Sequence, residues 1–99
     1  MLYFNDLQSA SECFRTLSSP ARIEILQLLA QRKELNVNAL AEELNLTTAT
    51  VSLHIKKLLD CGLIRVRSIP GKHGTQKLCS LKEDKMLVEL NSYFSKEQN

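Results

Sequence analysis

Residues 38–68, NALAEELNLTTATVSLHIKKLLDCGLIRVRS, contain two helical patterns, the turn between them and the beginning of a strand. Apolar residues recur at helical spacing in residues 38–44, and Asn45 tolerates the left-handed backbone of a tight turn. Thr47 is an N-cap residue for a second helix over residues 47–60, and Gly62 suits the residue just past its end. Val51, Ile55 and Leu58 repeat on one side of this helix. Two short helices joined in this way form a helix-turn-helix.

After Gly62 the hydrophobic period changes from helical spacing to strict alternation. Leu63 to Ser68 alternate apolar and basic or polar residues, which is typical of a half-buried strand. PGKHG (residues 70–74) has the composition of a turn, and residues 76–81 predict a return strand. We therefore expect a β-hairpin, whose projecting part, residues 68–77, is called the wing below.

Three further helices are predicted outside this unit. The first covers residues 6–17 with Asp6 at its N-terminus, and the second begins at Pro20 after the cap Ser19. Asn36 and Asn38 are alternative caps for the helix that ends at Leu44. A last helix is expected over residues 82–95, where apolar side chains again recur at helical spacing. The predicted fold is α+β, mainly α with a hairpin: a winged helix-turn-helix with five helices in the order α-α-α-α-β-β-α.

Length and composition limit the class of protein. A chain of 99 residues with 43% hydrophobic and 24% charged residues fits one globular domain over residues 1–99. We expect a soluble cytoplasmic protein, because no apolar run reaches the ~20 residues of a membrane span and the first residues lack a basic signal-peptide region. Three cysteines without a CxxC motif disfavour a disulfide scaffold and a zinc finger. The sequence contains no Ser/His/Asp set, no phosphate loop and no HExxH motif, so we do not expect an enzyme.

Charge is unevenly distributed along the chain. The formal net charge of +2 is small, but residues 54–77 contain six basic residues and one acidic residue, a net charge of +5, so that the rest carries −3. A merely solvated helix face would show mixed signs, whereas a basic helix and wing is the electrostatic pattern of phosphate binding. The outward face of the helix is otherwise small and polar, which allows it to enter the major groove. The candidate DNA-binding residues are Thr47, Thr48, Ala49, Ser52, Leu53, Lys56, Lys57, Arg65, Arg67, Lys72, His73 and Lys77.

The segments LSSPARIEILQLL and ELNVNALAEELNLTTATVSLHIKKLLDCGLIRVR, followed by a glycine-flanked wing, resemble the ArsR/SmtB family of winged-helix bacterial repressors. The resemblance covers about residues 10–81. It implies a homodimer that places two recognition helices in successive major grooves of a palindromic operator. By this resemblance Thr48, Ala49, Ser52 and Leu53 match base-facing positions, with Lys56 and Lys57 near phosphates. Leu53 departs from the histidine that the family usually has, and an aliphatic side chain there could touch a thymine methyl.

Many members of that family sense metals, so the family's ligand positions were compared with this chain. Asn36 and Asn38 stand in ELNVNAL where thiol sensors have cysteines, and the predicted last helix contains no histidine. We therefore expect neither a metal site nor a cofactor. Cys13, Cys61 and Cys79 leave thiol-based redox sensing as a minor alternative, because single cysteines are more often inert packing residues. His54 is interpreted as a packing or phosphate-contact residue.

The first and last predicted helices carry more apolar surface than one thin domain can cover. We expect Leu7, Phe14, Met86, Leu90, Tyr93 and Phe94 to form a dimer interface, although some of them must complete the monomer's own core. Two alternatives to a complete dimeric repressor stay open. The chain could be the DNA-binding head of a larger regulator, or a winged-helix adaptor that binds protein instead of DNA. The operator and the effector are not evident from the residues.

Overall fold

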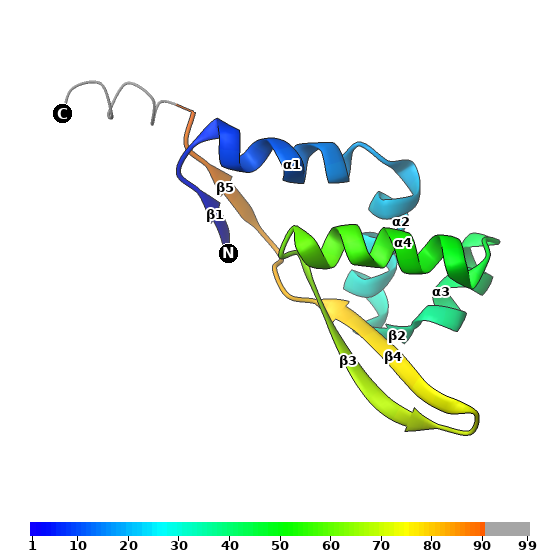
Figure 1. Ribbon diagram of the computed structural model, residues 1–99. Coiled ribbons are helices and arrows are strands. Elements are labelled where there is room, and N and C mark those ends of the chain that lie inside the picture. The colour runs from blue at the N-terminus through cyan, green and yellow to red at the C-terminus, as the bar shows by residue number, and fades with distance from the viewer. Residues whose placement is uncertain (91–99) are drawn as a thin grey trace.

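The computed structural model describes residues 1–90, which form four helices and five strands (Figure 1). In chain order these are β1 (Leu2–Phe4), α1 (Leu7–Leu17), α2 (Pro20–Arg32), β2 (Glu34–Asn36), α3 (Val37–Leu44), α4 (Thr48–Asp60), β3 (Ile64–Gly71), β4 (Gly74–Leu81) and β5 (Met86–Val88). The winged helix-turn-helix prediction is confirmed as an α+β fold with a hairpin wing. The predicted count of five helices is wrong for this part of the chain.

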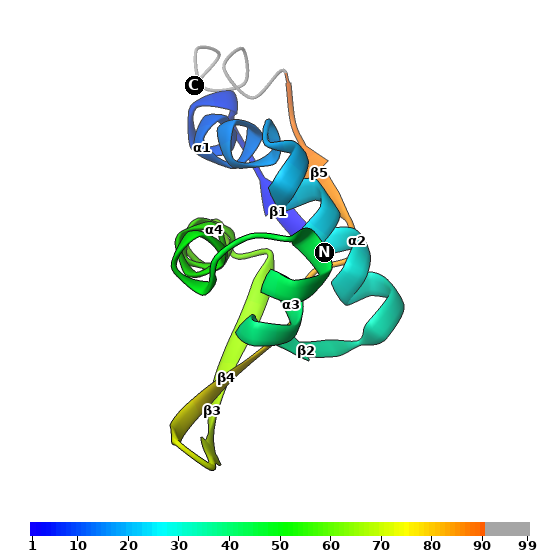
Figure 2. The same cartoon turned by 90° about the vertical axis from the view of Figure 1, so that its right-hand side faces the viewer.

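The strands form two small sheets. β2, β4 and β3 make an antiparallel sheet in that order, with Val66 opposite Cys79 and Gly71 opposite Gly74. β1 and β5 make a separate parallel pair, in which Tyr3 is opposite Leu87. Figures 1 and 2 show the β3–β4 hairpin projecting away from the helices, while the β1–β5 pair lies beside α1 at the other end of the molecule. The hairpin is longer than predicted, because only Lys72 and His73 remain outside its two strands.

The helix expected over residues 82–95 is the main correction. Residues 86–88 instead form β5, held by backbone hydrogen bonds such as that from Glu89 N to Phe4 O (3.0 Å). Strand geometry turns Met86 inward with Leu2 and Phe4 against the core and leaves Leu87 exposed. The short apolar run MLV fits either a helix or a strand, and a partner strand at the other end of the chain decides the outcome. Tyr93 and Phe94 lie outside the described residues.

The core joins all four helices to the three-stranded sheet. Its fully buried centre consists of Ile25, Leu29, Leu40, Val51, Leu58 and Ile64, together with Cys13 and Cys79. α2 contributes Ile25 and Leu29, which confirms that it lies at the centre of the fold, although Ile23 on the same helix is exposed. No helix within residues 1–90 is both long and apolar enough to cross a bilayer.

The ends of the helices follow the signals in the sequence. Asp6 Oδ1 accepts a hydrogen bond from Ser9 N (2.7 Å), and Thr47 Oγ1 accepts one from Thr50 N (3.1 Å). Asn36, rather than Asn38, caps α3 by accepting from Ala39 N at 2.7 Å. α4 ends with the hydrogen-bond pattern of a Schellman motif, in which Gly62 N donates to Leu59 O and Leu63 N to Leu58 O. Gly62 takes φ +83°, a conformation that glycine adopts without steric cost.

A polar clamp around Arg22 holds α4 against the first two helices. Arg22 Nε donates to Thr16 O at the end of α1 (2.6 Å), and Arg22 Nη1 lies 3.1 Å from His54 Nδ1 on α4. Burial lowers the pKa of His54 below its usual 6.5, and the positive charges of Arg22 and Lys57 lower it further. The neutral imidazole can therefore accept the hydrogen bond that a charged one could not. His54 is a packing residue, in agreement with one of the two interpretations of the sequence.

Two positive-φ residues give a test of the helix ends. Replacing Gly62 by alanine should lower the free energy of unfolding by about 1 kcal/mol, because a side chain is strained at φ +83°. Lys33→Gly should raise it by a similar amount, because Lys33 ends α2 at φ +66° and is exposed. Urea denaturation of the two variants checks both signs. Equal changes of the same sign would contradict the assigned backbone conformations.

The clamp predicts a pH dependence of stability. Because the pKa of His54 is lower in the folded than in the unfolded chain, the unfolded state binds more protons below about pH 6.5. The contribution of neutral His54 to the free energy of unfolding should be fully present above pH 6.5 and should be lost as the pH falls below that value. Urea denaturation at pH 7.5 and at pH 5.5 measures this change. We expect the free energy of unfolding of His54→Gln to decrease less between these two pH values than that of the unaltered protein. His73→Gln, at the wing tip, is the matched control and should behave like the unaltered protein. A full decrease in His54→Gln would show that His54 is not its source.

Candidate nucleic-acid interface

The helix-turn-helix is built from α3, a turn at Asn45–Thr47 and α4. Asn45 adopts φ 54° and ψ 46°, as expected for a left-handed residue, and its N–H together with that of Leu46 closes the end of α3. Leu40 and Ala41 bury α3, while Val51, Ile55 and Leu58 bury one side of α4. This burial fixes how α4 is rotated about its axis, and so it fixes which side chains face outward.

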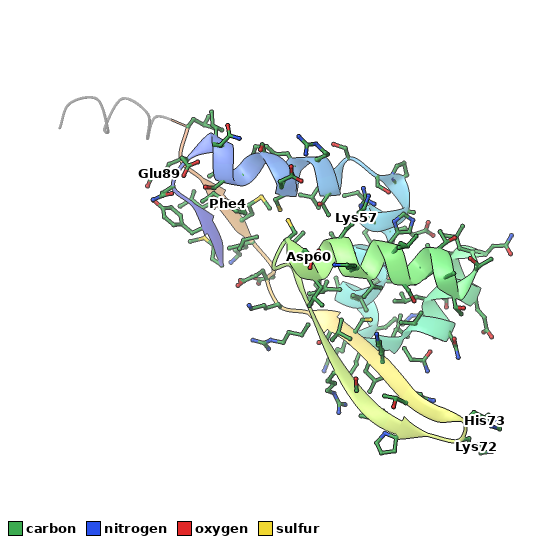
Figure 3. All side chains as sticks on the ribbon, viewed as in Figure 1. Phe4, Lys57, Asp60, Lys72, His73 and Glu89 are labelled. Carbon is green, nitrogen blue, oxygen red and sulfur yellow. The ribbon has the colours of Figure 1, made fainter. Side chains whose placement is uncertain are left out.

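All twelve residues predicted to bind DNA are exposed, and they lie on α4, at its N-cap and on the hairpin, where Arg65 is opposite Ser80. Ala49, Leu53 and Lys56 follow one another at helical spacing along the outward ridge of α4, opposite its buried side. Thr48 and Ser52 lie on the side of α4 that faces the hairpin, where they line a groove with Lys77. Thr47 caps the helix. Lys57 lies on the other side, toward α1 and α2, so it is separated from the hairpin side of the helix (Figure 3).

The groove between the start of α4 and the hairpin has a volume of about 260 Å³, and all of its lining residues except Val37 have polar side chains. Besides Thr48, Ser52 and Lys77 it contains Asn38 from α3 and Gln76 from β4. Asn38 and Gln76 were not among the predicted DNA-binding residues. Their amides have the donor and acceptor pair that reads adenine in the major groove. The signal in the sequence was their polar character at positions next to the predicted turn and strand, but only the folded hairpin brings them beside α4.

The wing presents its basic residues at two levels. Lys72 and His73 form the two-residue tip between Gly71 and Gly74, far from the helices (Figure 3). Lys77 is nearer the body of the protein, opposite Ser68 on β3. A side chain at Gly71 would meet Gln76 Cγ and Gly74 O at 3.0 Å, so this glycine permits close packing of the hairpin. The extended reach of the tip fits contact with a second site on a duplex.

Two of the predicted phosphate-binding cations already have acidic partners. Arg67 makes a bidentate contact with Glu34 on β2, with Nε–Oε2 and Nη2–Oε1 distances of 2.9 Å. These hydrogen bonds lower the pKa of Glu34 and raise that of Arg67. Lys56 Nζ lies 3.3 Å from Asp60 Oδ2, one turn along α4. A phosphate would therefore compete with these carboxylates. The pairing of Arg67 with Glu34 was not predicted, because the two residues are far apart in the sequence.

The cysteines occupy two places in the core. Cys13 on α1 lies close to Cys61, which follows α4, and burial is the main cause that raises the pKa of Cys13 to about 12, with the Cys61 thiol adding to the increase. Burial also raises the pKa of Cys79 to about 11. Cys13 and Cys79 are therefore protonated thiols at neutral pH, which are poor nucleophiles. The contact between Cys13 and Cys61 was not predicted, because it joins elements far apart in the sequence.

The positions where related sensors hold metals have structural roles or face solvent. Asn36 caps α3, and Asn38 is exposed at the polar groove. Within residues 1–90 no three histidine, cysteine or acidic side chains come together in a way that could hold a metal ion.

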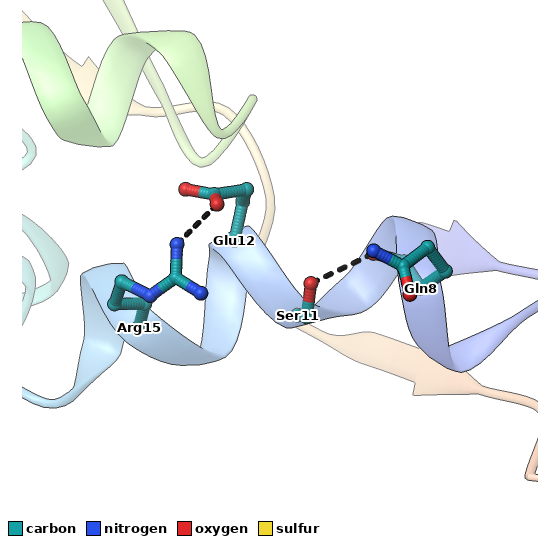
Figure 4. Close-up of polar contacts among 4 residues, drawn as sticks. All are labelled: Gln8, Ser11, Glu12 and Arg15. Carbon is teal, nitrogen blue, oxygen red and sulfur yellow. Dashed lines mark hydrogen bonds and ion pairs between the residues drawn. The ribbon is translucent and has the colours of Figure 1, made fainter.

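Four of the six residues predicted for a dimer interface lie within the described part of the chain, on α1, on β5 or just after β5. Leu7, Phe14 and Leu90 are exposed, whereas Met86 is partly buried against the core. Tyr3 and Leu87, which were not predicted, are exposed on the adjacent β1–β5 pair. Nearby on the surface of α1, Arg15 forms an ion pair with Glu12 and Ser11 Oγ donates to Gln8 O at 2.8 Å (Figure 4).

Comparison with known proteins gives a consistent identification. The sequence model of the arsR family of bacterial regulatory proteins matches residues 19–66, from the cap of α2 into β3. An HTH-type transcriptional regulator of Methanocaldococcus jannaschii is 29% identical over 79 residues, which are 80% of this chain and 84% of that protein. The HTH-type transcriptional regulator KmtR of Mycobacterium tuberculosis is 41% identical over 56 residues, 57% of this chain and 42% of that protein.

Solved structures agree with this result. The NMR structure of a homodimeric winged helix-turn-helix DNA-binding domain from Mycobacterium bovis, a possible ArsR-family regulator, has a TM-score of 0.67 and 26% identity. The similarity covers 79% of this chain and 68% of that one. The exposed α4, the hairpin wing and the matched residues lead to one conclusion. Residues 19–66 are similar to the arsR family of bacterial regulatory proteins, and the chain is a winged helix-turn-helix transcriptional regulator rather than an enzyme.

Proposed function

We propose that the chain represses transcription as a homodimer, with α4 in the major groove and the wing, residues 68–77, against the DNA backbone or the minor groove. The observation that carries this proposal is the exposure of all twelve candidate residues on α4 and the hairpin, while the opposite side of α4 is buried. A helix fixed in this way presents the same side chains to every duplex. Such a regulator acts where the DNA is, so we place it in the cytoplasm.

Phosphate contacts would come from cations on both sides of α4. Lys57 has no described ion pair, and Lys72 and Lys77 extend along the hairpin. Lys56 and Arg67 would exchange Asp60 and Glu34 for phosphates. The exposed Lys56–Asp60 pair contributes little to stability, so its exchange costs little, whereas the bidentate Arg67–Glu34 pair costs more to exchange. We propose Asn38 and Gln76 as additional contacts at the polar groove, beside Thr48 and Ser52.

The apolar side chains at α1 and the β1–β5 pair support a dimer. Tyr3, Leu7, Phe14, Leu87 and Leu90 are all exposed there, and exposed apolar patches are typical of protein–protein contact surfaces. The related domain from Mycobacterium bovis is homodimeric. A two-fold symmetric dimer would bind two half-sites about one helical turn, ~34 Å, apart, and so it would select a palindromic operator.

Two other readings of the function remain as alternatives. The described residues, 1–90, would serve equally as the DNA-binding head of a larger regulator, since KmtR extends well beyond the matched segment. A winged-helix adaptor that binds protein would tolerate loss of the basic residues. The similarity to the arsR family favours DNA, and charge variants separate the two.

Lys56→Ala combined with Arg67→Ala should weaken binding to every duplex, specific or not. Because each cation that contacts a phosphate releases counterions, log K against log salt should become shallower by about 0.9 for each lost contact. Fluorescence anisotropy with a labelled duplex over a range of salt concentrations measures both effects.

The matched control is Lys33→Ala combined with Lys85→Ala, which removes the same two charges from exposed positions outside α4 and the hairpin. It should leave the salt slope unchanged. Glu34→Gln should strengthen binding, because it releases Arg67 from its carboxylate partner. An unchanged slope in the first variant would reject the proposed phosphate surface.

Phe14→Asp should separate the dimer, because it places a charge in the apolar surface on α1, where Phe14 is 42% exposed. Sedimentation equilibrium should report a monomer, and affinity for a two-half-site duplex should fall at least tenfold as the linked second contact is lost. Ile23→Asp is the control, since Ile23 is similarly exposed at 37% but lies on α2. A dimer that survives Phe14→Asp while Ile23→Asp dissociates it would place the interface on α2 instead.

A further inference from the structure

Leu53 stands out on the recognition helix because its side chain is 65% exposed on the outward ridge. Its neighbours along that ridge are the small Ala49 and the charged Lys56, and Ser52 lies beside it toward the hairpin. Leaving a leucine in water forgoes the ~1.5–3 kcal/mol that its full burial provides. A side chain of this kind at the centre of a polar face is expected to be covered when the protein is bound to its partner.

The surface beside Leu53 extends the apolar area. A groove of about 340 Å³ runs between α4 and the hairpin, and its lining is largely apolar. Val37, Ile55, Leu59 and Val66 contribute the apolar part, and the cations Lys56 and Lys77 stand at its edges. Leu59 is itself 44% exposed and lies about 1.7 turns along the helix from Leu53. The adjacent groove at the start of α4 is polar, so the two halves of the hairpin side differ in chemistry.

An apolar side chain can read only one feature of a base pair in the major groove. Guanine, cytosine and adenine present hydrogen-bonding groups there, whereas thymine also presents its C5-methyl group. A leucine neither donates nor accepts a hydrogen bond, so it can gain free energy from that methyl group alone. Lys56 and Lys77 at the edges of the groove favour a polyanion over an apolar protein partner.

We propose that Leu53 is a specificity-determining residue, which packs against the C5-methyl group of one thymine in each operator half-site. The hydroxyls of Thr48 and Ser52 and the amides of Asn38 and Gln76 then face the neighbouring base pairs through the polar groove. This inference rests on the proposed insertion of α4 in the major groove, and it adds the identity of one base pair to it.

The experiment begins with binding sites recovered by the full chain from a random duplex library. Each thymine of the best site is then replaced, one position at a time and in both half-sites, by deoxyuridine, which removes only the methyl group. We expect one symmetric position at which the replacement lowers affinity. The expected loss is about fourfold per half-site, the equivalent of one buried methylene group.

Leu53→Ala should lose this sensitivity and bind the thymine and uracil duplexes equally. Because Leu53 is exposed, the variant should unfold at the same temperature as the unaltered protein, which a thermal melt verifies. Ser52→Ala, its neighbour on α4, is the control and should keep the response to deoxyuridine at that position. A 5-methylcytosine placed there should regain part of the affinity that cytosine loses, because it restores the methyl group.

Each outcome separates this inference from the proposed function. Salt-dependent binding that responds to no deoxyuridine replacement would overturn the role of Leu53 and leave DNA binding intact. A Leu53→Ala protein that keeps the response would assign the methyl contact to another residue. Failure of the unaltered protein to bind any duplex would reject both, and a protein partner lost with Leu53→Ala would then assign the ridge to that partner.

Discussion

The burial of Val51, Ile55 and Leu58 against α2 and α3 is the constraint on which the rest of the structure depends. Because these three side chains lock the rotation of α4, the remaining sides of the helix acquire separate roles. One faces the hairpin, one faces α1 and α2, and one projects outward. The Schellman end at Gly62 then redirects the chain into β3, so the hairpin leaves the body at a fixed place beside the helix. A change in this core would move the helix and the wing together.

Ion pairs formed by Lys56 on α4 and Arg67 on the hairpin reduce how strongly these two elements attract a polyanion. Glu34 and Asp60 each hold one of these cations in the free protein. The Lys56–Asp60 pair is exposed to solvent and exchanges partners readily, whereas Glu34 is half-buried and holds Arg67 by two hydrogen bonds. Such internal competition limits binding to arbitrary duplexes, where phosphates alone are available. It therefore favours sites at which base contacts add to the phosphate contacts.

Local signals in the sequence predicted most of the DNA-binding unit. Asp6, Ser19, Thr47 and Gly62 end or begin helices through hydrogen bonds to their own neighbours, so the amino-acid type is enough to place them. Features that join distant segments were missed. The MLV run is a strand only because β1 pairs with it, and the contacts of Arg67 with Glu34 and of Cys13 with Cys61 cross between elements. Of the candidate site, the exposed residues were predicted, whereas the groove that unites Asn38, Gln76 and Ser52 required the fold.

The parallel pairing of β1 with β5 has a consequence for the order in which the protein folds. Tyr3 donates its hydroxyl hydrogen to Glu89, a residue 86 positions away, so this small sheet closes nearly the entire described chain into a loop. Loop closure of that length costs more entropy than the local contacts of the helix-turn-helix, and contacts between distant segments form slowly. The helices and the hairpin should therefore assemble first and β1–β5 last. Tyr3 and Leu87 belong to the apolar surface proposed as the dimer interface. A second chain would therefore associate only with a molecule in which β1 and β5 have already paired.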